Sequence, residues 1–191
     1  MKLALLDQKK ELRRVYRLRR ESINVSLKAR WEQEIIHRLE VLFGQLSLRK
    51  VAGYRAFGSE VSLEKLYQKK DLSYSFPQIE GDGMRFLTPK VPNTFVKNIF
   101  KIDEPDPESS EEVLLSELQA VLIPGLVFDR RGYRLGYGKG FYDKALVQYT
   151  GFKIGIAFKN QIENKELPVE DHDLPMDFVV TEDFILNPLA A

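Results

Sequence analysis

The sequence of 191 residues contains no cysteine and only two histidines, His37 and His172. Without cysteine, the chain has no disulfide framework, no thiolate zinc site and no cysteine nucleophile. Two histidines also argue against a histidine-rich transition-metal centre. The chemistry of an active site must therefore use oxygen ligands, cationic side chains and the backbone.

Net charge and long apolar runs are also scarce. The formal net charge is +1, so no overall field attracts nucleic acid, although the first twenty residues are locally basic. No apolar run approaches the length that crosses a bilayer, and the amino terminus lacks the apolar core of a signal peptide. We expect a soluble, cytoplasmic monomer that acts on small molecules, with no nucleic-acid or membrane partner.

The order of the expected elements indicates the fold. Helices are expected over residues 4–21, after a cap at Ser26, over 62–69 and over 111–118, and strands over 51–57, 72–76, 84–87, 121–128, 153–158 and near Val179. Residues 101–110 contain two prolines and should form a crossing loop. This alternation predicts a single α/β domain over 1–191, with a mostly parallel, mixed sheet sandwiched by helices in a Rossmann-like, three-layer arrangement.

A glycine-rich segment follows the apolar run at 121–128, with glycines at 136, 138 and 140. Missing Cβ atoms let a ligand approach the backbone, and successive N–H groups can point inward as an anion nest. Helical spacing begins at Phe141, so the partial positive charge of a helix amino terminus would lie beside the nest. The pattern predicts a phosphate site, and a flexible surface turn is the alternative.

Charged residues surround these glycines. Arg134 and Lys139 supply positive charge, and Asp143, one turn into the expected helix, could hold a divalent cation on the same phosphates. The segment matches neither G-x-x-x-x-G-K-[ST] nor G-x-G-x-x-G, so the two standard nucleotide motifs are absent. A solvated turn has no need of these ordered cations, which favours the phosphate site.

Other candidates lie outside the loop. Lys9 and Arg13 are four residues apart on the first helix, so both can reach one anionic site. Most other basic residues of that helix, Arg20 among them, fit a solvated face or a weak nucleic-acid contact. Glu60 follows an expected strand, where open α/β sheets bind ligands. Asp173 belongs to an acid-rich loop, for which plain surface is an equal alternative.

Several motifs together resemble a known family. Residues 124–129 read Pro-Gly-Leu-Val-Phe-Asp, and they are followed by Gly132, Arg134-Leu135-Gly136, Gly138, Gly140 and Tyr142-Asp143. This pattern is similar to the signature of the 5-formyltetrahydrofolate cyclo-ligase family, also called methenyltetrahydrofolate synthetase. Lys9 to Arg13 resembles its K-x-x-L-R element, and Tyr54 with Glu60-Val61 resembles its Tyr and Glu-Val-x-Thr elements. Leu63 stands where the family usually has threonine, so one hydroxyl contact is missing.

The resemblance implies a set of site residues. For ATP these are Lys9, Arg13, Arg134, Leu135, Gly136, Tyr137, Gly138, Lys139, Gly140, Phe141 and Tyr142. For the folate substrate they are Arg55, Glu60, Tyr137, Gly138, Lys139, Gly140 and Phe141. Arg134 and Lys139 would be catalytic, and Asp143 and Asp173 would hold Mg²⁺.

The resemblance also implies a reaction, in which ATP phosphorylates the formyl oxygen of 5-formyltetrahydrofolate and ring closure gives 5,10-methenyltetrahydrofolate. The substrate supplies its own nucleophiles, which agrees with a sequence that offers no obvious one. Two other classes compete. A nucleic-acid-binding protein would use the basic first helix, and a sugar-phosphate isomerase or acyl-transfer enzyme would use the nest without ATP but would need a carboxylate base.

Overall fold

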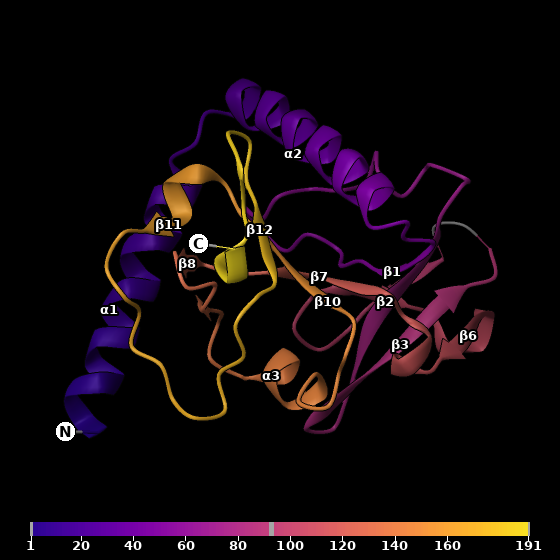
Figure 1. The fold of residues 1–191 in the computed structure, drawn as a ribbon. Helices are drawn as coiled ribbons and strands as arrows, with labels where there is room; N and C mark the ends of the chain where they lie inside the picture. Colours follow the sequence, from indigo (N-terminus) through magenta and orange to yellow (C-terminus); the bar gives the residue numbers. More distant parts are fainter. Residues whose placement is uncertain (1, 92–93, 191) are drawn as a thin grey trace.

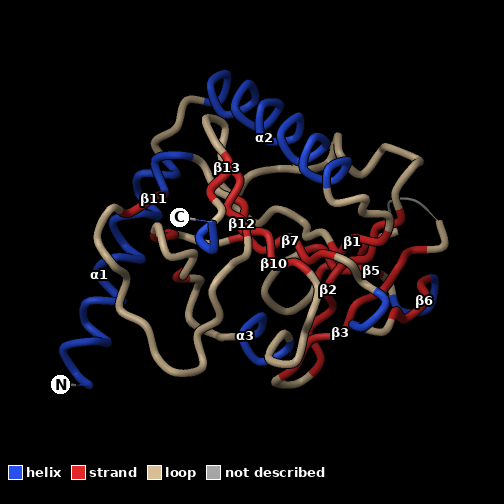
Figure 2. Tube along the Cα trace, viewed as in Figure 1, coloured by secondary structure: helices blue, strands red, loops and turns tan. Residues whose placement is uncertain are grey.

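The computed structural model describes residues 2–91 and 94–190, and its centre is an eight-stranded sheet (Figure 1; Figure 2). The strand order is β13-β12-β10-β7-β1-β2-β3-β6. The bounds are β1 Lys50–Ala52, β2 Ser73–Glu80, β3 Gly83–Pro89, β6 Ser110–Val113, β7 Ala120–Pro124, β10 Phe152–Ile156, β12 Phe178–Val180 and β13 Ile185–Leu186. The strands from β12 to β2 pair in parallel, and β13, β3 and β6 join in antiparallel fashion. The predicted mostly parallel, mixed sheet is confirmed.

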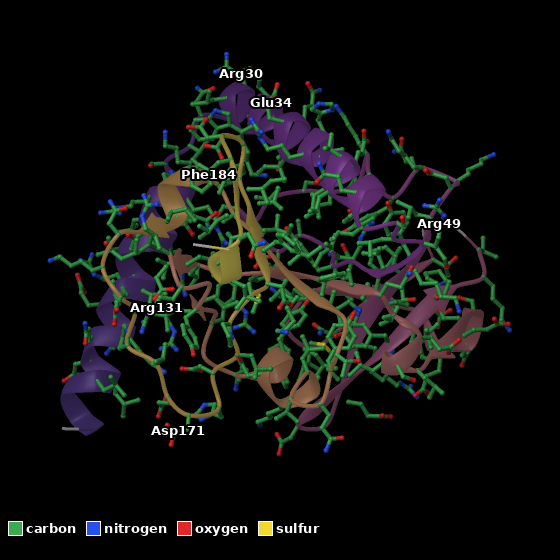
Figure 3. The ribbon with its side chains drawn as sticks, viewed as in Figure 1. Arg30, Glu34, Arg49, Arg131, Asp171 and Phe184 are labelled. Carbon is green, nitrogen blue, oxygen red and sulfur yellow. The ribbon has the colours of Figure 1, made fainter. Side chains whose placement is uncertain are left out.

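Helices cover both faces of this sheet. The long helix α2 (Val25–Gln45) crosses one face, and the short helix α3 (Phe141–Ala145) lies on the other (Figure 1). Side chains such as Arg30 and Glu34 project from α2 away from the sheet (Figure 3). The helices and the sheet between them form the three layers that the sequence predicts.

The central strand β7 shows how its sequence produces these layers. Leu122 belongs to one core cluster together with Ile35 of α2, whereas Val121 and Ile123 belong to the other cluster together with Leu146. Successive side chains of a strand point to opposite faces, so a strand covered on both sides needs apolar residues at every position. The unbroken apolar sequence of β7 meets that need.

A second, smaller sheet lies beside the first and carries α1 (Lys2–Glu21). Its strands are β11 (Ile162–Glu163), β8 (Val127–Asp129) and β9 (Arg134–Leu135). Tyr16 of α1 is buried in a small core with Val127, Leu135 and Leu167. This packing holds one side of α1 against the segment that leads into the glycine loop.

The single strand expected over 121–128 is wrong, because the chain turns at Gly125 and continues as β8 in the smaller sheet. The ring of Phe128 packs directly on this glycine, and a Cβ at Gly125 would lie 2.7 Å from Phe128 Cε2. An apolar run does not show where one buried strand ends and the next begins. As a result, the glycine loop follows β9 of the smaller sheet and leads into α3.

Two expectations that follow β1 are also wrong. The strand expected over 51–57 ends at Ala52, and residues 62–69 form turns rather than a helix. The Tyr67 hydroxyl accepts a hydrogen bond from Tyr54 N at 3.1 Å and donates one to Tyr54 O at 2.9 Å. Tyr67 therefore satisfies the backbone N–H and C=O of Tyr54, which a neighbouring strand would otherwise have paired. Local helical spacing could not reveal this contact.

The helix expected over 111–118 is wrong as well. Residues 110–113 instead pair with β3 as the edge strand β6, and a 3-10 turn at Leu115–Glu117 follows. The crossing loop expected over 101–110 contains a short strand and a 3-10 turn. These are β5 (Asp103–Pro105), which pairs with β4 (Phe95–Lys97), and the turn Pro107–Ser109. Pairing with a distant strand overrides weak local helical preference.

The two long helices need one correction. Asn24, rather than Ser26, caps α2, because its Oδ1 accepts a hydrogen bond from Ser26 N at 2.9 Å.

Across residues 2–91 and 94–190, no helix combines the length and the apolar character that a membrane span requires.

Candidate functional site

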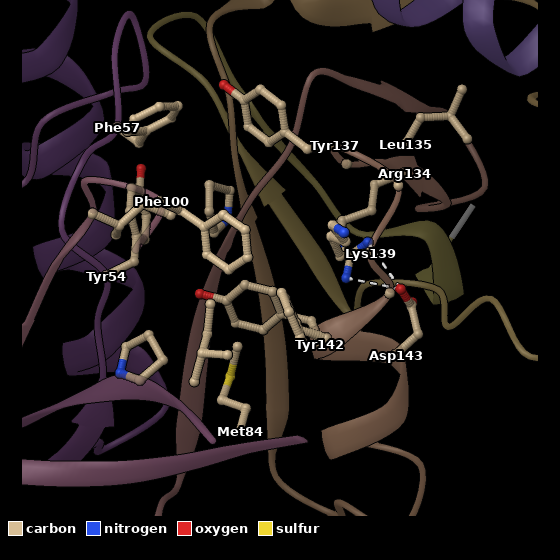
Figure 4. Close-up of a pocket in the computed structure, with 18 of the residues that line it drawn as sticks. Tyr54, Phe57, Met84, Phe100, Arg134, Leu135, Tyr137, Lys139, Tyr142 and Asp143 are labelled. Atoms are coloured by element: carbon tan, nitrogen blue, oxygen red, sulfur yellow. Dashed lines mark hydrogen bonds and ion pairs between the residues drawn. The ribbon is translucent and has the colours of Figure 1, made fainter. Parts of the chain in front are cut away.

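A cavity of about 480 Å³ opens at the carboxyl ends of β1 and β7, where Tyr54 and Pro124 line it. Its walls come from α1, the loop after β1, the hairpins β2–β3 and β4–β5, the glycine loop and the acid-rich loop before β12. Open α/β sheets bind ligands at this edge. Figure 4 shows aromatic side chains on one side of the cavity and the charged glycine loop on the other.

The residues that the sequence predicts for the site come together in this cavity. Its lining includes Lys9, Arg13, Arg55, Glu60, Arg134, Leu135, Gly136, Tyr137, Gly138, Lys139, Gly140, Phe141, Tyr142, Asp143 and Asp173. They come from four separate segments of the chain. One bound molecule, or two adjacent ones, could therefore contact both the aromatic side of the cavity and the charged side formed by the glycine loop.

The glycine loop has a backbone that side chains with a Cβ rarely adopt. Gly138 has φ +100° and Gly140 has φ +67°, both in the region that favours glycine. A Cβ at Gly138 would also lie 3.5 Å from Arg13 Cζ. The helix α3 starts at Phe141 as expected, but it has only five residues. A helix dipole therefore adds less than the sequence led us to expect, and the loop amides and side-chain cations dominate.

The two predicted cations of α1 reach opposite sides of the site. Arg13 Nε donates to the carbonyl oxygen of Gly136 at 2.9 Å, so it holds the glycine loop. The buried Lys9 Nζ donates to Glu170 Oε2 at 2.8 Å and to Asp173 Oδ2 at 3.0 Å. Burial alone would lower the pKa of Lys9, but these two carboxylates raise it above its ordinary value. Lys9 is therefore a fixed positive charge.

Arg134 and Asp143 form a buried ion pair at 3.3 Å, drawn with dashed lines in Figure 4. Both contacts go to Asp143 Oδ2, and Arg134 Nε, also buried, has no hydrogen-bond partner among the described residues. A buried donor without a partner is costly in the folded state. A ligand oxygen in the cavity could satisfy it.

Glu60 is a buried carboxylate at the other side of the cavity. Its Oε2 accepts a hydrogen bond from Phe57 N at 2.9 Å. Burial raises the pKa of Glu60 from 4.5 to about 7, against the opposing effects of this hydrogen bond and of the charges of Arg20 and Lys28. Near neutral pH, Glu60 can therefore either donate or accept a hydrogen bond.

The remaining wall is largely apolar and comes from Pro77, Ile79, Met84, Phe100 and Ile102. Such a wall suits a flat, partly apolar ring system. Lys139 Nζ lies 5.9 Å from the centre of the Phe100 ring, so the glycine loop and the β4–β5 hairpin approach each other here.

Arg55 also lines the cavity, but its guanidinium is already engaged. It pairs with Glu64 and stands 4.3 Å from the centre of the Phe95 ring. Leu63, the departure from the family motif, is buried in the core rather than in the lining.

Sequence reasoning missed three residues. Arg20 is 2% exposed, which corrects its placement on a solvated face. Its spacing of seven from Arg13 puts it on the same side of α1, and that signal could have found it. Glu170 lines the cavity beside Lys9. Glu104 is a second buried acid of the lining, and its Oε1 accepts hydrogen bonds from Ile79 N at 3.1 Å and Asn98 Nδ2 at 2.7 Å.

A metal ion at this site would need ligands from a bound substrate. Residues 2–91 and 94–190 contain no group of three or more histidine, aspartate or glutamate side chains placed to hold a metal. Asp143 and Asp173 nevertheless line one cavity with carboxylate oxygens, the ligand type that Mg²⁺ prefers. Two carboxylates with phosphate oxygens make a usual Mg²⁺ site, so the residues present fit this ion.

The model of the 5-formyltetrahydrofolate cyclo-ligase family matches residues 6–182. The chain belongs to this family. The match covers every residue that the sequence predicts for the site.

Individual cyclo-ligases and a solved structure agree with this assignment. The Escherichia coli (strain K12) 5-formyltetrahydrofolate cyclo-ligase is 37% identical over 102 residues, which are 52% of this chain and 56% of that protein. The Haemophilus influenzae enzyme of the same name is 28% identical over 180 residues, 89% of this chain and 95% of that protein. The NMR structure of Aquifex aeolicus 5,10-methenyltetrahydrofolate synthetase has a TM-score of 0.84 at 31% identity and covers 94% of this chain and 92% of that one.

The raised pKa of Glu60 predicts how stability changes with pH. Because the folded state binds this proton more tightly than the unfolded state, Glu60 lowers the free energy of unfolding as pH rises from about 4.5 to about 7. Glu60→Gln removes this titration. The free energy of unfolding of the variant, minus that of the wild type, should increase by about 2 to 3 kcal/mol between pH 4 and pH 8. Urea denaturation at both pH values measures it, and an unchanged difference would show that Glu60 ionises normally.

Proposed function

We propose that this protein uses Mg-ATP to convert 5-formyltetrahydrofolate into 5,10-methenyltetrahydrofolate, with release of ADP and phosphate. One observation carries the proposal: a single cavity joins a cationic glycine loop to an apolar wall with a buried acid. The cationic glycine loop suits a triphosphate, and the apolar wall with its buried acid suits a folate ring. Membership of the family and the likeness to the Aquifex aeolicus synthetase support the same reaction.

ATP would occupy the charged side, in contact with Lys9, Arg13 and the loop from Arg134 to Tyr142. Gly136, Gly138 and Gly140 let phosphate oxygens approach backbone N–H groups. Arg134 Nε, which has no partner in the described parts of the chain, offers a further donor. Leu135, Phe141 and Tyr142 would contribute backbone and wall contacts at the ends of the loop.

The folate would occupy the apolar side, close to Glu60 and Arg55. Residues 137–141 line the cavity, and their backbone would lie between the two ligands and could touch both. Lys139 comes from this middle segment and is exposed in the structure. Its charge is therefore available to a transferring phosphoryl group.

The reaction needs positioning and charge stabilisation rather than a protein nucleophile. The formyl oxygen would attack the γ-phosphorus, and the bond from that phosphorus to the bridging oxygen would break, releasing ADP. N10 would then attack the activated formyl carbon and lose its proton, and the phosphate would leave with the former formyl oxygen. Arg134 and Lys139 would stabilise charge on the γ-phosphoryl oxygens, and alignment of the two ligands would supply much of the rate.

Asp143 and Asp173 would hold Mg²⁺. When bound, the ion would neutralise phosphate charge. Lys9 pairs with Asp173 and Arg134 pairs with Asp143, so these two cations hold the carboxylates in place in the lining of the cavity.

The protein would act as a cytoplasmic monomer with no nucleic-acid or membrane partner. Its balanced charge favours this, as does the structure of α1, in which Lys9 and Arg20 are buried and cannot contact an external polyanion. A sugar-phosphate isomerase could use Glu60 as a base, but it would not consume ATP.

A turnover assay tests the proposed function. Purified protein with Mg-ATP and 5-formyltetrahydrofolate should form methenyltetrahydrofolate, followed by its near-ultraviolet absorbance, together with ADP. Omission of ATP or addition of EDTA should stop the reaction. A folded protein that gives no absorbance gain, or that gains it without ATP, would contradict the proposal.

Asp143→Asn tests the proposed metal ligand. The amide keeps an oxygen for Arg134 but loses the charge that Mg²⁺ requires, so kcat should fall by about a hundredfold or more, near 3 kcal/mol. Alanine is a poorer choice because it would leave Arg134 buried and unpaired. Asp82→Asn, in the exposed turn between β2 and β3, is the matched control. Undiminished, Mg-dependent turnover of Asp143→Asn would reject the role.

A further inference from the structure

The buried guanidinium of Arg20 links α1 to three other segments. Its Nε donates to Ser59 Oγ at 2.9 Å, its Nη1 to the carbonyl oxygen of Gly125 at 3.1 Å and its Nη2 to the hydroxyl of Tyr137 at 2.6 Å. None of the described carboxylates forms an ion pair with it. A fully buried charge held only by neutral oxygens is costly to keep, so a requirement beyond packing is the simplest reason for arginine here.

The partners of Arg20 fix the direction of one proton. A guanidinium only donates hydrogen bonds, so the Tyr137 oxygen must be the acceptor in this contact. The phenolic proton therefore has to point elsewhere. Among residues 2–91 and 94–190, no acceptor for it is found. Tyr137 is thus a donor whose acceptor is not part of the described chain.

The position of Tyr137 shows where this proton is available. The residue lines the cavity and is 44% exposed. Both of its neighbours, Gly136 and Gly138, are glycines, so the loop alone does not hold the side chain of Tyr137. The Phe57 ring meets it edge to face at 6.1 Å, and the two rings stand together over the cavity in Figure 4. The hydroxyl is therefore on the Glu60 side of the cavity.

The surrounding charges keep the proton on Tyr137. Burial and the negative field of Glu60 raise the pKa of Tyr137 above its ordinary value, although Arg20 acts in the opposite direction. The phenol is neutral at physiological pH and polarised by a cation. Such a hydroxyl is a stronger donor than an isolated one.

We propose that Tyr137 donates a hydrogen bond to a carbonyl oxygen of the bound folate, and that Arg20 is the positioning residue that forces it to be the donor. The inference rests on the proposed function, because it assigns a recognition contact within the same site. Arg20 does not touch the ligand. It acts through Tyr137 by occupying the hydroxyl oxygen and holding the ring beside Phe57.

Calorimetric binding of 5-formyltetrahydrofolate without ATP tests the donor. Tyr137→Phe should weaken this affinity about tenfold, and in turnover it should raise the KM for the folate while the KM for ATP stays within about twofold. Tyr133→Phe is the control, because Tyr133 is not among the residues that line this cavity and its hydroxyl forms a hydrogen bond with none of the described residues. If the wild type binds the folate and Tyr137→Phe binds it equally well, the inference is wrong and the proposed function stands. If the folded wild type binds no folate, both are wrong.

A double-mutant cycle tests the role of Arg20. Arg20→Lys keeps the charge but cannot reach three acceptors, so folate affinity should fall about tenfold in the wild-type background and less than about twofold in the Tyr137→Phe background. Arg14→Lys, on the exposed side of α1, is the control. Equal losses in both backgrounds, or an equal loss of ATP affinity, would show that Arg20 only supports the fold. Thermal denaturation confirms that each variant is folded.

Discussion

The site depends on the contact between α1 and the glycine loop. The loop contains three glycines within five residues, so it has few side chains of its own to fix its shape. Arg13 holds the Gly136 carbonyl, and Arg20 holds the Gly125 carbonyl and the Tyr137 hydroxyl. Lys9, on the same helix, fixes the acid-rich loop through Glu170 and Asp173. One helix therefore positions both loops that face the cavity.

This arrangement also explains how several charged side chains can be buried in a protein whose net charge is close to zero. Lys9 is matched by two carboxylates, Arg134 by Asp143, and Arg20 by neutral oxygens with Glu60 nearby. The carboxylates of Glu170, Asp173 and Asp143 each hold a cation in place, while Arg134 Nε remains a donor without a partner among the described residues. A bound Mg-triphosphate would bring both signs of charge at once, so it could replace these internal partners without leaving a buried charge unpaired.

Sequence reasoning found the parts of the candidate site whose signals lie within a few neighbouring residues. The alternate glycines, the spacing of Lys9 and Arg13 and the apolar run before the loop each have their signal within a few residues, and the three glycines, Lys9 and Arg13 all line one cavity. The positions of Glu60 and Asp143 along the chain already marked them as candidates, whereas Arg55 and the metal-binding role of Asp173 came from the family motifs. The alternation of elements was also enough to predict the mixed, mostly parallel sheet.

The failures share one cause, which is dependence on distant residues. The helix expected over 111–118 gave way to pairing with β3, and the strand expected over 51–57 ended early because Tyr67 satisfies the Tyr54 backbone. Arg20 looked like a surface cation because its partners lie 39 to 117 residues away along the chain. Local spacing contains no information about such partners.

In the proposed complex, the backbone amides of the glycine loop, held by α1, would face the phosphates of ATP. Amide chemical shifts, followed by ¹H–¹⁵N NMR during titration with Mg²⁺ and a non-hydrolysable ATP analogue, test it directly. We expect the amides of residues 136–141 to shift most and those of the strands β3 and β6 to shift little. Saturating binding that leaves the glycine-loop amides unchanged would contradict it.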